Sequence, residues 1–342
     1  MIDSTIRKLV DGQHLSRPEM RSVLCDVMDG GATDVQKTAL LVALRMKGET
    51  VAEVTGAAEA MRERVIPLDV NGSNVVDTCG TGGDGRGTIN VSTIAALVAA
   101  GAGVPIAKHG NRAVSSSCGS ADVLAALGAR IDLEAPAMEE VFRRAGISFL
   151  FAPKLHPAMA AVVAVRKELG LRTIFNLLGP LTNPARARRQ VLGVYAPHLV
   201  PLIAEVLRAL GAERALVVHS RDGMDEISPA AATDVCEVTD RGDIERYALE
   251  PEELGLEPSP PDALRGGDAA TNARAARRVL EGAKGAHREA VVANAGAAIY
   301  VGGLAGSIRE GVALARASID SGRALGKLDA MIEATYAAEA RS

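Results

Sequence analysis

Residues 77–93 read DTCGTGGDGRGTINVST, and the interpretation of the whole chain starts from this stretch. Residues 80–87 contain five glycines within eight positions. Glycine adopts positive φ at little cost and lets bare N–H groups approach a ligand, so such a run is typical of a phosphate loop. A β-like run at 74–76 precedes the loop, and an alanine-rich helical pattern follows it. We therefore predict a strand, a phosphate loop and a helix, in that order.

Two better-known loops do not match this stretch. Gly80, Gly82 and Gly85 satisfy G-x-G-x-x-G, but the dinucleotide-binding form of that pattern has an acidic residue about 20 positions later. Here the corresponding region, 104–112, reads VPIAKHGNR and is basic. A P-loop fails as well, because Arg86 precedes the last glycine and no lysine follows it. For the loop alone, a surface turn without a ligand stays the alternative.

Composition limits the class of protein. A chain of 342 residues with 48% hydrophobic content can bury a large core and form two domains. A net charge of −4 and 2% aromatic residues argue against a nucleic-acid partner. The first residues lack the apolar core of a secretory signal, and no uncharged apolar stretch approaches about 18 residues. We expect a cytoplasmic protein that does not enter a membrane.

The cysteines do not indicate a metal or disulfide framework. Cys25, Cys79, Cys118 and Cys236 are scattered without C-x-x-C spacing, so we expect neither bridges nor a zinc site. Cys79 has no histidine beside it in the sequence that could activate it as a nucleophile. We interpret it as a small core residue.

The fold class that we predict is α/β, with a small all-helical domain and a large α/β domain built on a mostly parallel central sheet. Apolar positions repeat at helical spacing through residues 4–65, and the apolar third helix suggests burial on two sides. After a linker at 67–73, predicted strands alternate with helices. The strands are 75–76, 104–107, 130–133, 148–151 and 215–218, and the helices are 92–100, 121–127, 137–145 and 199–210.

Other segments complete the predicted organisation. Residues 158–182 resemble the N-terminal helices, so the helical domain is expected to comprise 1–70 with a return at about 158–182. The α/β domain then comprises 71–157 and 183–342. We interpret 239–262 as a peripheral hairpin and loop, and three glycine-terminated helices follow between 272 and 322.

Two further loops carry chemistry. Lys108, His109 and Arg112 follow a predicted strand and precede a serine-rich turn, so they can clamp phosphate oxygens. Loops after neighbouring parallel strands open into one crevice, which favours a phosphorylated substrate. In SRDGMDEISP, Asp225 and Glu226 are adjacent carboxylates that can hold Mg²⁺ together with phosphates and water. A solvated basic turn and a plain Asp/Gly turn are the alternatives.

With these motifs in order, the chain resembles the anthranilate phosphoribosyltransferases of tryptophan biosynthesis over nearly its full length. The resemblance is carried by GTGGDGRGTINVST (80–93), KHGNRAVSSSCGSADVLAALG (108–128), FLFAPKLHPAM (149–159), VRKELGLRTIFNLLGPLTNPA (165–185), DGMDEIS (222–228) and NAGAAIYVGG (294–303). It implies a homodimer formed through the helical domain. It also implies two Mg²⁺ ions and the substrates anthranilate and phosphoribosyl pyrophosphate (PRPP).

The same resemblance implies site residues. PRPP would contact Gly80, Gly83, Asp84, Thr88, Asn90, Val91, Ser92, Thr93, Lys108, His109, Gly110, Asn111, Arg112, Ala113, Val114, Ser115, Ser116 and Ser120. The metal ligands would be Ser92, Asp225 and Glu226. Anthranilate would contact Gly80, Asn111, Arg166, His109 and Pro180, and the planar Arg166 guanidinium suits its carboxylate.

The chain departs from the family pattern at a few positions. Cys118 stands where we expect serine, Ser117 where many relatives carry lysine, Ile89 replaces a frequent phenylalanine and Met224 a frequent leucine. None removes an expected ligand.

The expected reaction is attack of the anthranilate amine on C1 of the ribose, which gives N-(5-phosphoribosyl)anthranilate and pyrophosphate. An aryl amine is neutral at pH 7, so we expect no single indispensable proton-transfer residue. Two alternatives stay open: a pyrimidine nucleoside phosphorylase-like enzyme, or a non-catalytic relative that binds nucleic acid.

Overall fold

The structure is a computed structural model and describes residues 2–70, 74–113 and 117–339. A helical lobe opens the chain and consists of α1 (Ile2–Val10), α2 (Arg17–Met28), α3 (Asp34–Lys47) and α4 (Val51–Arg62). Capping boxes begin α2, α3 and α4, where Ser16, Thr33 and Thr50 each accept a hydrogen bond from the third helical N–H. None of the described helices is long and apolar enough to cross a bilayer.

The rest of the helices follow between and after the strands. They are α5 (Val91–Gly101), α6 (Ser120–Ala126), α7 (Ala135–Ala145), α8 (Ala152–Leu155), α9 (Ala160–Leu169), α10 (Phe175–Leu178), α11 (Leu199–Ala209), α12 (Ala269–Leu280), α13 (Ala286–Val301), α14 (Ile308–Asp320) and α15 (Arg323–Glu339). Short 3₁₀ turns lie at η1 (Pro157–Met159), η2 (Gly179–Leu181), η3 (Pro251–Leu254) and η4 (Pro261–Leu264).

One sheet forms the centre of the larger lobe. Its strands are β1 (Val76–Asp77), β2 (Ile106–Gly110), β3 (Ile147–Phe151), β4 (Arg189–Gly193), β5 (Arg214–Ser220), β6 (Thr233–Val238) and β7 (Ile244–Leu249). Their order is β3-β2-β1-β4-β5-β6-β7. Strands β1 to β5 pair in parallel, and β6 and β7 are antiparallel. This arrangement confirms the predicted fold class.

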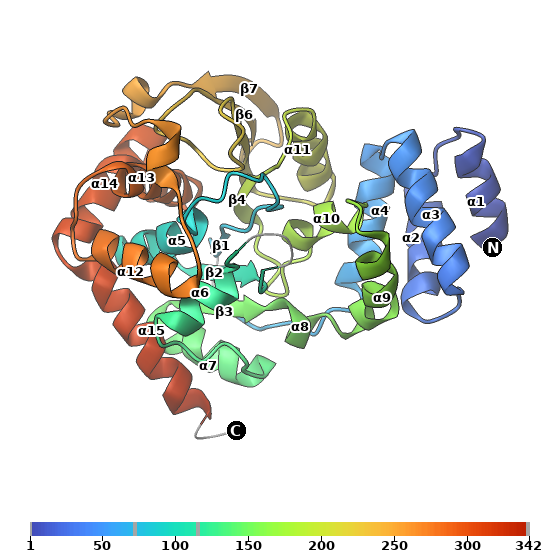
Figure 1. The fold of residues 1–342 in the computed structure, drawn as a ribbon, viewed down its shortest axis with the longest axis horizontal. Helices are drawn as coiled ribbons and strands as arrows, with labels where there is room; N and C mark the ends of the chain where they lie inside the picture. The colour runs from blue at the N-terminus through green and yellow to red at the C-terminus, as the bar shows by residue number, and fades with distance from the viewer. Residues whose placement is uncertain (1, 71–73, 114–116, 340–342) are drawn as a thin grey trace.

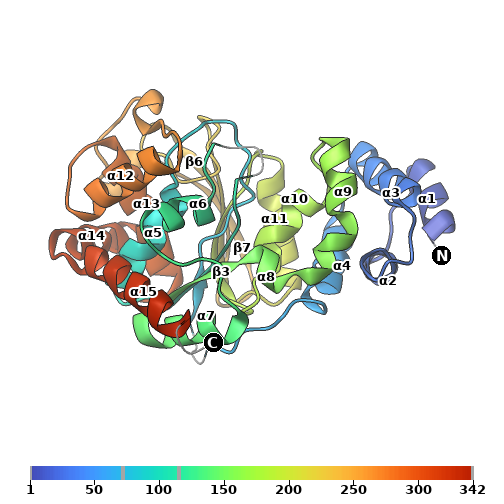
Figure 2. The same cartoon turned by 60° about the horizontal axis from the view of Figure 1, so that its bottom comes forward.

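Helices cover both faces of the sheet (Figures 1 and 2). Helices α5 and α12–α15 gather on one side, while α11 lies on the other side, toward the helical lobe. Successive residues of β5 point to opposite faces of the sheet. Leu216 and Val218 pack in the core with α5 and α13. Ala215 and Val217 pack in the core with α11 and α2–α4. The helical lobe therefore shares a core with one face of the sheet.

The chain returns to the helical lobe after β3, as expected. Helix α9 packs against α2 and α3, and α10 packs against α4. The domain boundaries themselves stay a prediction. Within one chain, α3 buries Leu40, Leu41 and Leu44 but leaves Val35 and Met46 80% and 83% exposed. The expected second cover of this helix thus does not come from the larger lobe.

Three expectations about elements were wrong or incomplete. Residues 130–133 form no strand; Ile131 and Leu133 are buried, and the Arg130 N–H bonds Thr335 Oγ1 at 3.2 Å on α15, so this segment packs under a helix while β3 pairs directly with β2. The hairpin begins earlier than expected, at β6. Strand β4 and helix α15 were not predicted.

Candidate active site

The glycine loop leaves the carboxyl end of β1 and enters α5. Gly82, Gly83, Gly85 and Gly87 have φ values of 64°, 78°, 73° and 62°. This left-handed conformation is costly for other residues, which explains the glycine spacing. The loop ends at the first turn of α5, where the positive end of the helix dipole favours an anion.

The end of strand β4 and the residues after it hydrogen-bond to the glycine loop. The Thr81 N–H donates to Gly193 O at 2.8 Å, and Thr81 Oγ1 accepts from the Tyr195 N–H at 3.1 Å. A Cβ on Gly80 would lie 3.1 Å from Gly193 O and 3.3 Å from Asp225 Oδ2. A Cβ on Gly193 would lie 1.5 Å from Asp225 O. Because neither glycine has a side chain, the glycine loop, β4 and the segment that carries Asp225 and Glu226 can pack against one another.

Lys108 joins the ends of β1 and β2. Its side chain is 4% exposed, and Nζ donates to Thr78 O at 2.9 Å and to Thr78 Oγ1 at 3.2 Å. Ser92 Oγ accepts from the same Nζ at 3.4 Å. Asp77 Oδ1 accepts from the His109 N–H at 3.1 Å. The loops after β1 and β2 therefore follow neighbouring parallel strands, as predicted. The expectation that Lys108 and His109 come after the strand was wrong, because both lie within β2 and are held by its pairing with β3.

Asp122 organises the second loop, and sequence reasoning missed it. Its Oδ2 accepts from the N–H groups of Ala113 and Gly119, both at 2.9 Å, and its Oδ1 accepts from Arg112 Nη1 at 3.0 Å. Asn111 O accepts from Ser120 Oγ at 3.2 Å. The expected ligands Val114, Ser115 and Ser116 lie outside the described residues. An aspartate in the first turn of a predicted helix was the available signal.

Asp225 and Glu226 follow β5 and stand beside the glycine loop. The Ser92 N–H donates to Glu226 Oε1 at 3.1 Å. Desolvation, followed by repulsion from Asp84, raises the pKa of Asp225 to about 7. Desolvation, followed by repulsion from Asp225, raises the pKa of Glu226 to about 8, although both residues keep some exposed surface. The carboxyl groups of Asp84, Asp225 and Glu226 therefore lie close enough to repel one another when they are ionised.

This donor set suits Mg²⁺. No group of three or more His, Cys, Asp or Glu side chains in the described ranges is arranged as a ready-made metal cage. Mg²⁺ commonly takes only one or two protein carboxylates and completes its octahedron with water and substrate phosphates. Asp225 and Glu226 next to an anion loop match that pattern, and a cation there would relieve their mutual repulsion. Ser92 lies close enough to Glu226 to belong to the same site.

A buried histidine pair lies beside this site, between the lobes. His109 Nδ1 donates to Gly179 O at 3.0 Å, since a carbonyl only accepts. In the neutral ring His109 Nε2 is then an acceptor, and His156 Nε2 donates to it at 3.1 Å. Burial lowers the pKa of His109 to about 3 and that of His156 to about 4. Both rings are neutral at pH 7. His156 stands in a motif quoted for the resemblance but was assigned no role.

Arg166 lies on α9 in the helical lobe, apart from the phosphate loops. Its guanidinium is 5.3 Å from the centre of the Phe175 ring, and burial lowers its pKa. Pro180 is buried, and its carbonyl accepts from Gln190 Nε2 at 2.7 Å. The expected anthranilate contacts therefore come from both lobes.

Arg172 was also missed. Its guanidinium lies 4.2 Å from the centre of the Tyr195 ring and donates through Nη2 to Gly83 O. It therefore links the segment after α9 directly to the tip of the glycine loop. Only its place in the motif 165–185 could have drawn attention to it.

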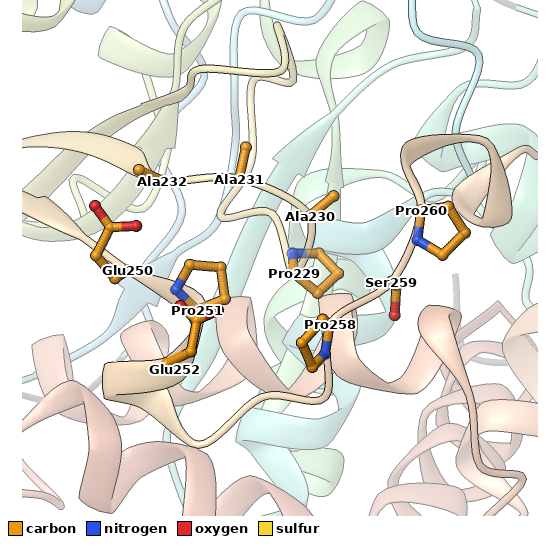
Figure 3. Close-up of a pocket in the computed structure, with 10 residues that line it drawn as sticks. All are labelled: Pro229, Ala230, Ala231, Ala232, Glu250, Pro251, Glu252, Pro258, Ser259 and Pro260. Atoms are coloured by element: carbon orange, nitrogen blue, oxygen red, sulfur yellow. The ribbon is translucent and has the colours of Figure 1, made fainter.

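A separate cavity of about 350 Å³ is lined in part by residues 229–232, which follow Asp225 and Glu226 in the chain (Figure 3). Residues 229–232, 250–252 and 258–260 line it, and the rings of Pro229, Pro251 and Pro258 lie around it. It contains none of the predicted site residues.

The comparisons with known proteins cover the whole molecule. Residues 3–65 match the family described as "Glycosyl transferase family, helical bundle domain", and residues 72–325 match "Glycosyl transferase family, a/b domain". Anthranilate phosphoribosyltransferase of Anaeromyxobacter dehalogenans (strain 2CP-C) is 56% identical over 335 residues, which is 98% of this chain and 99% of the relative.

Solved structures agree with this result. The crystal structure of anthranilate phosphoribosyltransferase from Thermus thermophilus superposes with a TM-score of 0.91 at 46% identity, over 97% of this chain and 99% of the other. The Saccharomyces cerevisiae enzyme in complex with PRPP and Mg superposes with a TM-score of 0.89 at 28% identity, over 98% of both chains. The full-length similarity, the shared two-lobed fold and the three converging loops lead to one conclusion: this chain belongs to the anthranilate phosphoribosyltransferase family.

Proposed function

We propose that this chain transfers the phosphoribosyl group of PRPP to the amine of anthranilate and releases pyrophosphate. One observation carries the proposal: the loops after β1, β2 and β5 converge at the carboxyl edge of the sheet. There, backbone N–H groups and Lys108 face the paired carboxylates Asp225 and Glu226. In an open parallel sheet this edge is where ligands bind, next to the point at which strand order reverses.

The donor lies along the two anion loops. The positive-φ glycines turn N–H groups toward the pyrophosphate, and the first turn of α5 adds its dipole. Arg112 supplies a cationic side chain from the second loop, and Lys108 supplies one from β2. The proposed ligands are those expected from the sequence, namely residues 80, 83, 84, 88, 90–93, 108–116 and 120.

Asp225, Glu226 and Ser92 hold Mg²⁺ in this proposal, with two ions as in the expectation from the sequence. The metal supplies charge neutralisation for the pyrophosphate leaving group when it is bound. One support is the pair of carboxyl groups of Asp225 and Glu226, whose raised pKa values would fall if a cation were bound beside them. The other is the structure of the yeast relative in complex with PRPP and Mg. The protein's own part is to fix the carboxylates, through the Ser92 N–H, beside the phosphate loop.

Anthranilate approaches from the side of the helical lobe. Arg166 binds its carboxylate, and Gly80, Asn111, His109 and Pro180 line its path. His109 is neutral and already accepts from His156, so its Nε2 is not free to take a proton from the amine. Catalysis then rests on positioning and on charge stabilisation rather than on a proton-transfer residue.

A homodimer formed through the helical lobe is also proposed. Val10 on α1, Val35 and Met46 on α3 and Val163 on α9 are all more than half exposed, and α3 packs beside both α1 and α9. Large apolar side chains on adjacent helices favour a protein partner, and a second copy offers the same surface. The cytoplasmic location stays a prediction from the sequence.

Loss of anthranilate fluorescence on mixing with PRPP tests the proposed reaction. We expect turnover that requires Mg²⁺ and releases one pyrophosphate for each anthranilate consumed. Absence of turnover at saturating PRPP, anthranilate and Mg²⁺ would refute the proposal. Phosphorolysis of thymidine or uridine, measured on the same preparation, provides the comparison with a nucleoside phosphorylase.

A further inference from the structure

Asn272 on α12 contacts the substrate loops although it lies far from them in the sequence. Its side chain is 1% exposed. Oδ1 accepts from the Gly267 N–H at 2.8 Å, and Nδ2 donates to Asn90 Oδ1 at 2.9 Å. Asn90 Nδ2 in turn donates to Cys118 O at 3.0 Å. One chain of hydrogen bonds therefore connects α12 with the glycine loop and with the second anion loop.

The direction of this chain is fixed at both ends by the backbone. The Gly267 N–H can only donate, so the atom of Asn272 that faces it is Oδ1. Its Nδ2 must then face Asn90 Oδ1, which leaves Asn90 Nδ2 for the Cys118 carbonyl, a pure acceptor. Neither amide can flip without placing two donors or two acceptors against each other. The position of each loop is thus specified by hydrogen-bond polarity as well as by shape.

The turn at 266–267 reinforces the connection. The Gly266 N–H donates to Gly87 O at 2.8 Å, and a Cβ on Gly266 would lie 2.6 Å from Asn272 Oδ1 and 2.7 Å from Thr88 O. On its other side, Ser117 Oγ donates to Gly267 O at 2.8 Å. Ser117 is one of the departures from the expected family pattern.

We propose that Asn272 is a positioning residue for PRPP. Together with the 266–267 turn and Ser117, it sets the separation between the glycine loop and the second anion loop. That separation decides whether both loops reach the same donor molecule. The inference rests on the proposed function, because it takes PRPP as the ligand of the two loops.

The variant Asn272→Asp tests the chain of hydrogen bonds with almost no change in volume. It places an oxygen against Asn90 Oδ1, and a flip of Asn90 only moves the clash of acceptors to Cys118 O. We expect the KM for PRPP to rise about tenfold or more, because buried polar atoms lose their partners. The KM for anthranilate should stay within about twofold of wild type, since none of the residues in this chain of hydrogen bonds is among those proposed to line the anthranilate path.

Val279→Ala is the matched control, because Val279 is buried on the same helix about two turns beyond Asn272. It weakens the packing of α12 without touching either loop, so both KM values should be unchanged. An equal rise in the KM for PRPP in this control, or equal rises for both substrates in Asn272→Asp, would mean that α12 acts only through general stability.

Ser117→Ala keeps the inference testable if Asn272→Asp does not fold. Ser117 is exposed, so the variant should keep the wild-type melting temperature while the KM for PRPP rises about two- to fivefold. Unchanged KM for PRPP in both folded variants overturns the inference while wild-type turnover stands. Wild-type protein that neither turns over nor binds PRPP in calorimetry with Mg²⁺ refutes the proposed function instead.

Discussion

Gly193→Ala is the sharpest perturbation of the proposed site, because it adds a single methyl group between two backbones. The new Cβ would lie 1.5 Å from Asp225 O and 2.5 Å from Asp225 C. Real Cβ atoms essentially never approach a heavy atom closer than 3.0 Å, so the carbonyl must retreat by about 1.5 Å. No flexible side chain can absorb this shift. The segment that moves carries Asp225 and Glu226, the two carboxylates among the three proposed metal ligands.

The expected magnitude follows from that displacement. Misplacing a reacting group by about 1 Å commonly costs about 100-fold in rate. We therefore expect kcat/KM to fall at least about 100-fold, with weaker Mg²⁺-dependent binding of PRPP. Overpacking of this kind also costs about 1–3 kcal/mol of folding free energy, so the variant should still fold but melt at a lower temperature.

The assay is anthranilate fluorescence loss at several Mg²⁺ concentrations, combined with calorimetric PRPP binding and thermal unfolding. Gly326→Ala on α15 is the control, because a Cβ there meets nothing within 4 Å and the backbone φ is not positive. It should leave activity unchanged and the melting temperature equal or slightly higher, because alanine favours a helix over glycine by about 0.5–1 kcal/mol. A folded Gly193→Ala protein with kcat/KM within twofold of wild type would refute the argument that this close approach positions the carboxylates.

Three further outcomes follow from the structure. Asp225→Asn should raise the Mg²⁺ concentration for half-maximal activity about tenfold or more, measured by titration at saturating PRPP; an unchanged requirement would remove Asp225 from the metal site. Burial lowers the folded-state pKa of His109 to about 3 and of His156 to about 4, below the unfolded value of about 6.5. The unfolded chain therefore binds more protons at these two positions between those values, and the histidines' contribution to the free energy of unfolding should drop by up to about 1.4 kcal/mol per pH unit per histidine as pH falls below about 6. Asp225 and Glu226, whose raised pKa values make the folded chain bind more protons in the same range, oppose this change. Urea melts at pH 7 and 5 of the wild type and of the double variant His109→Gln, His156→Gln isolate the histidine contribution, and an equal pH dependence in both proteins would contradict it. Replacing Val35 and Met46 together with lysine should convert a dimer to a monomer in light scattering; a wild-type monomer at micromolar concentration would contradict the proposed interface.

Much of the architecture could be predicted from local rules. The helical lobe was visible because its apolar residues repeat at helical spacing within a few positions of one another. The strands β2, β3 and β5 were found because they are short apolar runs between helices. Strand β4 was not, since RQVLG begins with two polar residues and lies after a proline-containing turn. Residues 130–133 had the composition of a strand, but their apolar side chains pack under α15.

The residues of the candidate site likewise fall into those that local sequence spacing predicts and those that only the fold reveals. Gly82, Gly85 and Lys108 could be singled out because a phosphate loop depends on residue types at fixed short spacing. His156, Arg172 and Asn272 could not, because their partners are distant in the sequence. The Asn272 and Asn90 side chains, for example, are separated by 182 positions.

By itself the sequence determined where the backbone turns, which helices begin and end at their caps, and that two anion loops and a carboxylate pair exist. These properties depend on the conformational freedom of single residues and on interactions within one or two turns of chain. Only the tertiary structure decided that β1 lies between β2 and β4, and hence that Gly80, Gly193 and Asp225 meet. Strand order and close backbone approach follow from the packing of the whole core, in which residues far apart in the chain compete for the same space.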